Sequence, residues 1–124
     1  MNKIKLFFTR LYFKHQLKKG ELIKVDNRHR GVGKTTMMVD HAIKHDLAIV
    51  VGSQESANVI KHLNQDIKVI RLAEKFTIEI KGTSTMFPNG VLIDESVEPK
   101  LIRLVTVNNF KIRGGFVQNY KKGE

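Results

Sequence analysis

The chemistry that this sequence could perform is concentrated in two short runs. Residues 28–36 read RHRGVGKTT, and residues 91–95 read VLIDE. A Gly-Lys-Thr turn lets backbone N–H groups wrap a phosphate, places an ammonium on the β- and γ-phosphates and offers a hydroxyl to Mg²⁺. An apolar strand that ends in Asp-Glu supplies a carboxylate for Mg²⁺ and a base for the attacking water. The two runs together predict a nucleotide site that takes ATP and Mg²⁺ as its cofactors.

The first run is predicted to hold the phosphates. Its binding residues are Arg30, Gly31, Val32, Gly33, Lys34, Thr35 and Thr36. Lys34 would act on the β- and γ-phosphates as a catalytic residue, Thr35 would ligate Mg²⁺, and Thr36 would bond the α-phosphate. Arg28 stands where the usual pattern Gly-x-x-x-x-Gly-Lys-Ser/Thr has its first glycine. The alternative is an ordinary strand–helix turn whose lysine is solvated.

The second run is predicted to hold the metal and the attacking water. Asp94 is the expected Mg²⁺ ligand, and Glu95 is the expected catalytic base, because a carboxylate beside a bound water can orient and deprotonate it. The alternative is an acidic pair that only marks the surface end of a strand.

Apolar patterns predict strands and helices in alternation. Short apolar runs indicate strands near residues 21–25, 47–51, 68–72, 91–93 and 116–119. The run LAIVV at 47–51 is unbroken, which is typical of a strand buried on both faces of a parallel sheet. Helical periodicity covers residues 35–45, 55–65 and 101–110, and residues 76–81 alternate as in an edge strand. We therefore expect an α/β fold with a mainly parallel sheet flanked by helices, the core of a minimal nucleotide-binding domain.

Residues 3–19 predict a basic amphipathic helix that ends at Gly20. Its expected apolar face comprises Ile4, Phe7, Phe8, Leu11, Tyr12 and Leu17. This face would dock on the core or on a partner subunit, with a membrane surface or a nucleic acid as the alternatives. We predict three parts: the helix at 1–20, a nucleotide-binding domain at 21–120 and a tail at 121–124.

Charge is distributed unevenly along the 124 residues, whose formal net charge is +10. Residues 1–31 carry nine Lys and Arg against two acids, and residues 100–124 carry six against one, whereas the middle is slightly acidic. Basic ends favour a nucleic acid partner through phosphate neutralisation, and a solvated basic surface is the alternative. The sequence has no cysteine and no apolar run long enough to span a bilayer, so we expect a cytoplasmic protein.

The pair RGVGKTT and VLIDE resembles the P-loop NTPase superfamily, in the class with an extra strand and a catalytic glutamate. The intervening segment HDLAIVVGSQESA is similar to the second strand and following helix of helicase and phage terminase ATPase cores. The resemblance covers roughly residues 21–119 and implies ATP, Mg²⁺ and phage-type DNA metabolism. In such hydrolases a polar residue on the strand between the two motif strands often senses the γ-phosphate. Gln118 or Asn119 could do this, or could simply be a polar strand end.

Two functions remain open at this point. The first is a Mg²⁺-dependent ATPase that acts with nucleic acid, in which a homo-oligomer could supply an arginine finger from a neighbouring subunit. The second is a reduced P-loop module that binds nucleic acid, or a host or phage protein, without hydrolysis. The intact Lys34, Thr35, Asp94 and Glu95 favour the first, and Arg28 in place of glycine favours the second.

Overall fold

Five strands form one all-parallel sheet in the order β1-β5-β4-β2-β3. The computed structural model describes residues 2–29, 31–72 and 86–119. The strands are β1 (Leu22–Val25), β2 (Ala48–Val51), β3 (Val69–Arg71), β4 (Val91–Ile93) and β5 (Ile112–Gln118). The helices are α1 (Lys3–Lys18), α2 (Lys34–His45), α3 (Gln54–Leu63) and α4 (Ile102–Val107), with short 3₁₀ turns η1 (Asn27–His29) and η4 (Pro99–Leu101). The expected α/β fold with a parallel sheet and flanking helices is confirmed.

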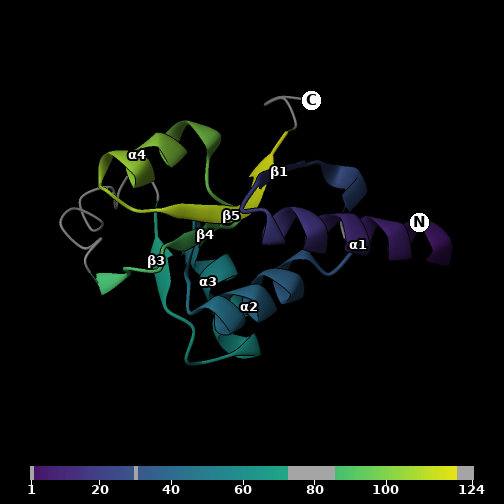
Figure 1. Ribbon diagram of the computed structural model, residues 1–124, viewed down its shortest axis with the longest axis horizontal. Coiled ribbons are helices and arrows are strands. Elements are labelled where there is room, and N and C mark those ends of the chain that lie inside the picture. Colours follow the sequence, from purple (N-terminus) through teal and green to yellow (C-terminus); the bar gives the residue numbers. More distant parts are fainter. Residues whose placement is uncertain (1, 30, 73–85, 120–124) are drawn as a thin grey trace.

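Helices cover both faces of this sheet. Figure 1 shows α4 on one face and α1, α2 and α3 on the other. Alternate residues of β2 divide between the two layers: Ile49 and Val51 join the core beneath α1–α3, and Ala48 and Val50 join the core beneath α4. This double burial explains why β2 is an unbroken apolar run. No helix in the described ranges is long and apolar enough to cross a membrane.

Most of the predicted elements appear within two residues of their expected bounds, whereas β5 and α4 differ by more. We expected Gly114-Gly115 to precede the last strand, but both glycines lie inside it. The β4–β5 register shifts between the pairs Val91↔Ile112 and Ile93↔Gly115, as in a β-bulge. At Gly115, φ is +135° and a Cβ would lie 2.1 Å from the carbonyl oxygen of Ile93. Glycine is therefore required by close strand contact rather than by a turn.

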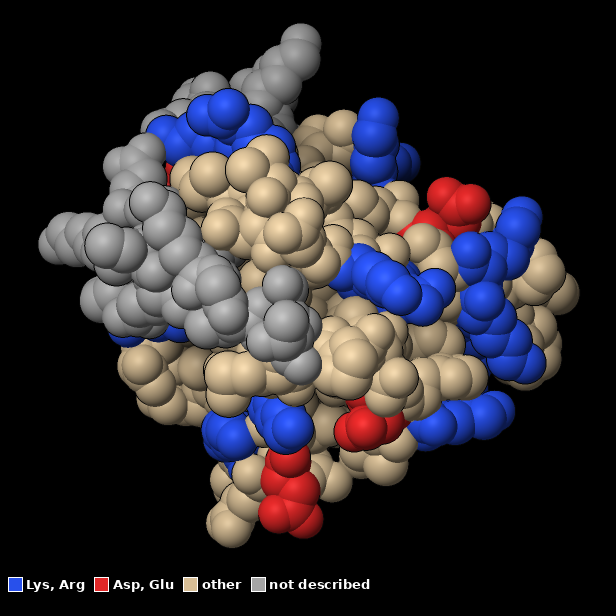
Figure 2. All heavy atoms as spheres, turned by 60° about the vertical axis from the view of Figure 1, so that its left-hand side comes forward, with Lys and Arg blue, Asp and Glu red and all other residues tan. Residues whose placement is uncertain are grey.

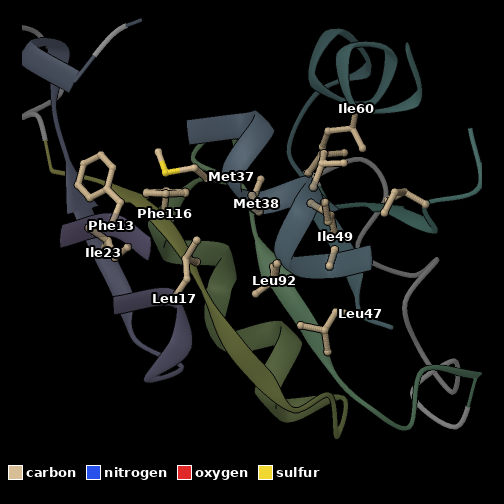
Figure 3. Packing of buried hydrophobic residues seen from close by; sticks show 14 of the residues in the cluster. Phe13, Leu17, Ile23, Met37, Met38, Leu47, Ile49, Ile60, Leu92 and Phe116 are labelled. Atoms are coloured by element: carbon tan, nitrogen blue, oxygen red, sulfur yellow. The ribbon is translucent and has the colours of Figure 1, made fainter. Parts of the chain in front are cut away.

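The expected apolar face of α1 is a second correction. The structure buries Phe13 and Leu17 against Ile23 and Phe116 (Figure 3). The rest of the predicted face points outward: Ile4, Phe7, Phe8, Leu11 and Tyr12 are between 47% and 70% exposed. The helix has two apolar stripes, and periodicity alone selected the longer stripe because it cannot tell which one meets the core.

The predicted edge strand at residues 76–81, the four residues 82–85 that follow it and the tail at 121–124 lie outside the described residues. The helix predicted at 101–110 is shorter than expected and follows η4, which Pro99 begins. Val105 is the one buried residue of α4, as expected for a short amphipathic helix that packs on one face of the sheet.

This arrangement brings both motif runs to one edge of the sheet. In a parallel sheet all carboxyl ends lie on the same side, and ligands bind where the strand order reverses. Here the chain leaves β1, crosses β5 and β4 to form β2, and returns later to fill the gap. The loop after β1 and the acids after β4 therefore flank the end of β5.

Alanine substitutions on the buried and the exposed face of α1 should differ in their effect on the free energy of unfolding. Phe13→Ala should lower the free energy of unfolding by about 3–5 kcal/mol because it empties a buried aromatic site. Phe8→Ala, at a 62% exposed position of the same helix, should change it by less than about 0.5 kcal/mol. Urea unfolding measures both variants. Equal losses, or a larger loss for Phe8→Ala, would contradict the observed orientation of α1.

Candidate phosphate and metal site

The chain between β1 and α2 forms a glycine-bearing turn that leads into a helix N-terminus. Gly31 and Gly33 have φ of +75° and +85°, in the left-handed region that glycine adopts without strain. Gly33 occupies the N-cap position of α2 and provides no side-chain cap. The first backbone N–H groups of α2 therefore have no side-chain acceptor there, and together with the helix dipole they favour an anion.

Arg28 does not disturb this turn, although it replaces the glycine of the usual pattern. It lies in η1, and its φ is not positive, so the backbone at this position does not require glycine. Its side chain points outward and is 84% exposed. The guanidinium and the backbone N–H of Arg28 both bond the Asp26 carboxylate, at 2.8–3.2 Å. The unusual residue is thus accommodated outside the loop.

Lys34 joins the two predicted runs. Its ammonium donates to the backbone carbonyl of His29 at 2.6 Å and lies 3.4 Å from Oε1 of Glu95. Lys34 is only 9% exposed, and a buried ammonium without partners would be strongly destabilising. The structure therefore brings the two predicted catalytic residues into contact, and the loop carbonyl fixes where the lysine side chain ends.

Asp94 is also buried, and Ser96 holds its carboxylate. The backbone N–H and the hydroxyl of Ser96 both donate to Oδ2 of Asp94, at 3.0 and 2.5 Å. The same hydroxyl accepts the backbone N–H of Gly52, which follows β2, at 2.8 Å. A Cβ on Gly52 would lie 2.1 Å from the Ser96 carbonyl oxygen, so only glycine allows this contact. Ser96 thereby orients the predicted metal ligand.

The two predicted metal ligands share a small cavity of about 200 Å³. Thr35 and Asp94 line it with Glu55, Ser56 and Val59 from α3. Hydroxyl and carboxylate oxygens are the ligands that Mg²⁺ prefers, and in phosphate sites one or two protein ligands suffice because waters and phosphates complete the shell. The residues present fit a magnesium ion bound with a nucleotide.

The side chains of the remaining predicted site residues form no hydrogen bond with Lys34 or Glu95 in the described part of the chain. Gln118 pairs with Val25, the last residue of β1, and the backbone N–H of Asn119 donates to the Val25 carbonyl. Neither side chain bonds Lys34 or Glu95 among the described residues. Thr36 is exposed in the first turn of α2. Arg30 lies outside the described residues, so its assignment to the nucleotide stays a prediction.

Ser96 and three other residues that the sequence did not single out also support the site. From α1, Nε of Arg10 donates to the carbonyl of Val32 in the loop at 3.0 Å, and the ring of Phe13 packs edge-on against His29. Glu55 adds a second carboxylate to the cavity beside Asp94. Ser96 could have been found from its spacing, since a residue two positions after Asp commonly bonds that carboxylate. Arg10 and Glu55 carry no such local signal.

No protein-family model, curated protein or solved structure matches this chain. The assignment of the site therefore depends on its own geometry.

The Asp26–Arg28 pair gives a testable electrostatic signature at the loop. The Arg28 side chain, then its backbone N–H, lower the pKa of Asp26 from 3.8 to about 2. Because the folded-state pKa is depressed, the contribution of Asp26 to stability is present above pH 3.8 and is lost as the pH falls toward 2. In Arg28→Ala the Asp26 pKa should rise toward 3.8 while remaining slightly below it, because the backbone bond persists. A carboxyl NMR titration measures this, and an unchanged pKa would contradict the pairing.

Proposed function

We propose that this protein binds ATP with Mg²⁺ at the carboxyl edge of its sheet and hydrolyses it, acting together with nucleic acid. One observation carries the proposal: the Lys34 ammonium lies beside Glu95, so the lysine of the glycine turn and the acids after β4 form one site. An ordinary strand–helix turn with a solvated lysine does not account for a lysine that is 9% exposed and bonded to both runs.

The sheet order supports the same class of protein. β5 lies between β1, which precedes the glycine turn, and β4, which precedes the acids. The class with a catalytic glutamate was expected to have an extra strand between its two motif strands, with a polar residue at its end. Gln118 and Asn119 end β5 at this position and are proposed as phosphate sensors.

Each residue of the site has a chemical task in this proposal. Lys34 would exchange its contacts with His29 and Glu95 for phosphate oxygens, and the uncapped N–H groups of Gly33 to Thr36 would bind the same phosphates. Thr35 and Asp94 would hold Mg²⁺, which neutralises charge on the phosphates. Glu95, released from Lys34, would orient the attacking water and accept its proton.

A reduced, non-hydrolysing module remains the second candidate, and one observation favours it. Glu95 is paired with Lys34, and a carboxylate that keeps this partner cannot serve as a base. In that case the site would bind a nucleotide, or hold a partner-responsive loop, without turnover.

Two substitutions distinguish binding from catalysis. Lys34→Ala should weaken ATP–Mg²⁺ binding at least tenfold and abolish phosphate release, because it removes the charge that meets the β- and γ-phosphates. Glu95→Gln should keep binding and lower turnover by about 10²–10⁴-fold, the usual contribution of general base catalysis. Isothermal titration and a phosphate-release assay measure the two effects.

Lys44→Ala, at an exposed lysine near the other end of α2, is the matched control and should change neither quantity. Loss of turnover in Glu55→Gln but not in Glu95→Gln would transfer the water-orienting role to Glu55. No binding of ATP by the wild-type protein would contradict both candidate functions. Binding without any phosphate release, with or without DNA, would leave the non-hydrolysing module.

Nucleic acid is proposed as the partner because the basic residues gather at both ends of the chain. Neutralisation of phosphates releases counterions, so the logarithm of the binding constant should fall linearly with the logarithm of salt concentration. With about four contacts to a DNA duplex, the slope should be about −3.6. Fluorescence anisotropy with a labelled oligonucleotide measures it, and a flat dependence on salt would exclude a phosphate-neutralising interface.

A further inference from the structure

A separate cavity lies at the sheet edge opposite the glycine turn. It has a volume of about 510 Å³ and lies among the end of α1, the end of α2, the start of β5 and the turn before β4. Its lining residues are Leu17, Lys18, Lys19, Gly20, His41, His45, Leu47, Pro88, Asn89, Lys111 and Arg113. The proposed ATP site uses none of them, so this cavity is separate from it.

The lining is strongly basic. Lys18, Lys19, Lys111 and Arg113 contribute four cations, and no Asp or Glu belongs to the lining. None of the four forms an ion pair with another described residue. Figure 2 brings the left-hand side of Figure 1 forward, and it shows several groups of Lys and Arg side chains over this face, with a few Asp and Glu side chains between them. Like charges held together without counterions favour an anionic ligand.

The fold brings these cations together from distant parts of the sequence. Lys18 and Lys19 belong to the basic N-terminal segment, and Lys111 and Arg113 belong to the basic C-terminal segment. Gly20, with φ of +77°, turns the chain after α1, and its Cβ position would lie 3.6 Å from the carbonyl oxygen of Arg113. Thus the two basic ends, which are separate in the sequence, meet at one cavity.

Two hydrogen bonds and one shifted pKa further describe the surroundings of this cavity. Nε of Arg113 donates to the carbonyl of Asn89 at 3.1 Å, which holds the guanidinium at the cavity wall. Burial, followed by the charges of His45, Lys44 and Lys18, lowers the pKa of His41, so the imidazole senses a positive environment. The nearby carboxylate of Asp46 lines a neighbouring cavity and accepts a bond from the Asn89 amide. Asp46 itself does not belong to the lining of the basic cavity.

We propose that this cavity binds the phosphate backbone of a nucleic acid. The inference rests on the nucleic acid part of the proposed function, and it locates that partner at the edge opposite ATP. The four cations provide phosphate contacts without base-reading geometry, so binding is expected to depend weakly on sequence. An anionic lipid surface fits less well, because the exposed apolar residues of α1 lie between Ile4 and Tyr12, nearer its other end.

Two double variants of equal charge test the location. Lys18→Ala/Lys111→Ala removes one cation from each side of the cavity. Lys3→Ala/Lys5→Ala removes two cations from the far end of α1, where both side chains are exposed. Anisotropy titrations use labelled single-stranded and duplex DNA oligonucleotides between 50 and about 300 mM salt, a range over which phosphate contacts change affinity by orders of magnitude.

The cavity variant should bind the duplex about 10–100-fold more weakly near 0.1 M salt, and its salt slope should be reduced by about 1.8, or about 1.4 for single strands. The control variant should keep at least most of the wild-type affinity and slope. Equal losses in the two variants would show that only net charge matters and would overturn the location. A larger loss in the control variant would overturn it as well.

Two parallel measurements distinguish this proposal from the proposed ATP site and from binding to a lipid surface. Titration with ATP–Mg²⁺ should give the same affinity for the cavity variant and the wild type, which also verifies folding. If the wild type binds ATP but no oligonucleotide, the cavity proposal fails while the nucleotide site stands. If it binds vesicles with anionic headgroups and the cavity variant loses that binding instead, the ligand is a lipid surface and the proposal is overturned.

Discussion

The buried ammonium of Lys34 is the constraint on which the site depends. A charge in this position must have partners, and the structure gives it a loop carbonyl from His29 and a carboxylate from Glu95. Through these two partners, Lys34 connects the segment after β1 to the segment after β4, on either side of β5. The same two contacts that stabilise the lysine also bring a cation and an acid beside the N-terminus of α2, where backbone N–H groups favour an anion.

Close backbone contacts extend this constraint through the sheet. Gly115 lets β5 lie against Ile93, and Gly52 lets the turn after β2 meet Ser96, which in turn fixes Asp94. On the other side, Arg10 and Phe13 of α1 support the loop through Val32 and His29. The opposite edge carries a separate basic cavity. The two ends of the strands thus present different chemistry, oxygen ligands and N–H donors at one and cations at the other.

Sequence patterns predicted the parallel α/β fold, and they predicted that Lys34 and Glu95 would meet, because strand ends in such a fold lie at one edge. The predictions from sequence failed where tertiary contacts determine the bounds of an element or which residues are buried. Gly114-Gly115 has the local signature of a turn, but contact with β4 places it inside a strand. Phe8 and Phe13 both belong to apolar stripes of α1, and only the position of the sheet decides which is buried. Arg10, Glu55 and the meeting of Lys18 with Lys111 depend on long-range packing, which no local pattern encodes.

A crystal structure with Mg²⁺ and a non-hydrolysable ATP analogue tests the central claim most directly. The account predicts that the phosphates lie on the turn between Gly31 and Thr36, that Lys34 leaves His29 and Glu95 to bond phosphate oxygens, and that Thr35 and Asp94 face the metal. An analogue bound elsewhere, with the Lys34–Glu95 pair intact and the turn unoccupied, would contradict it.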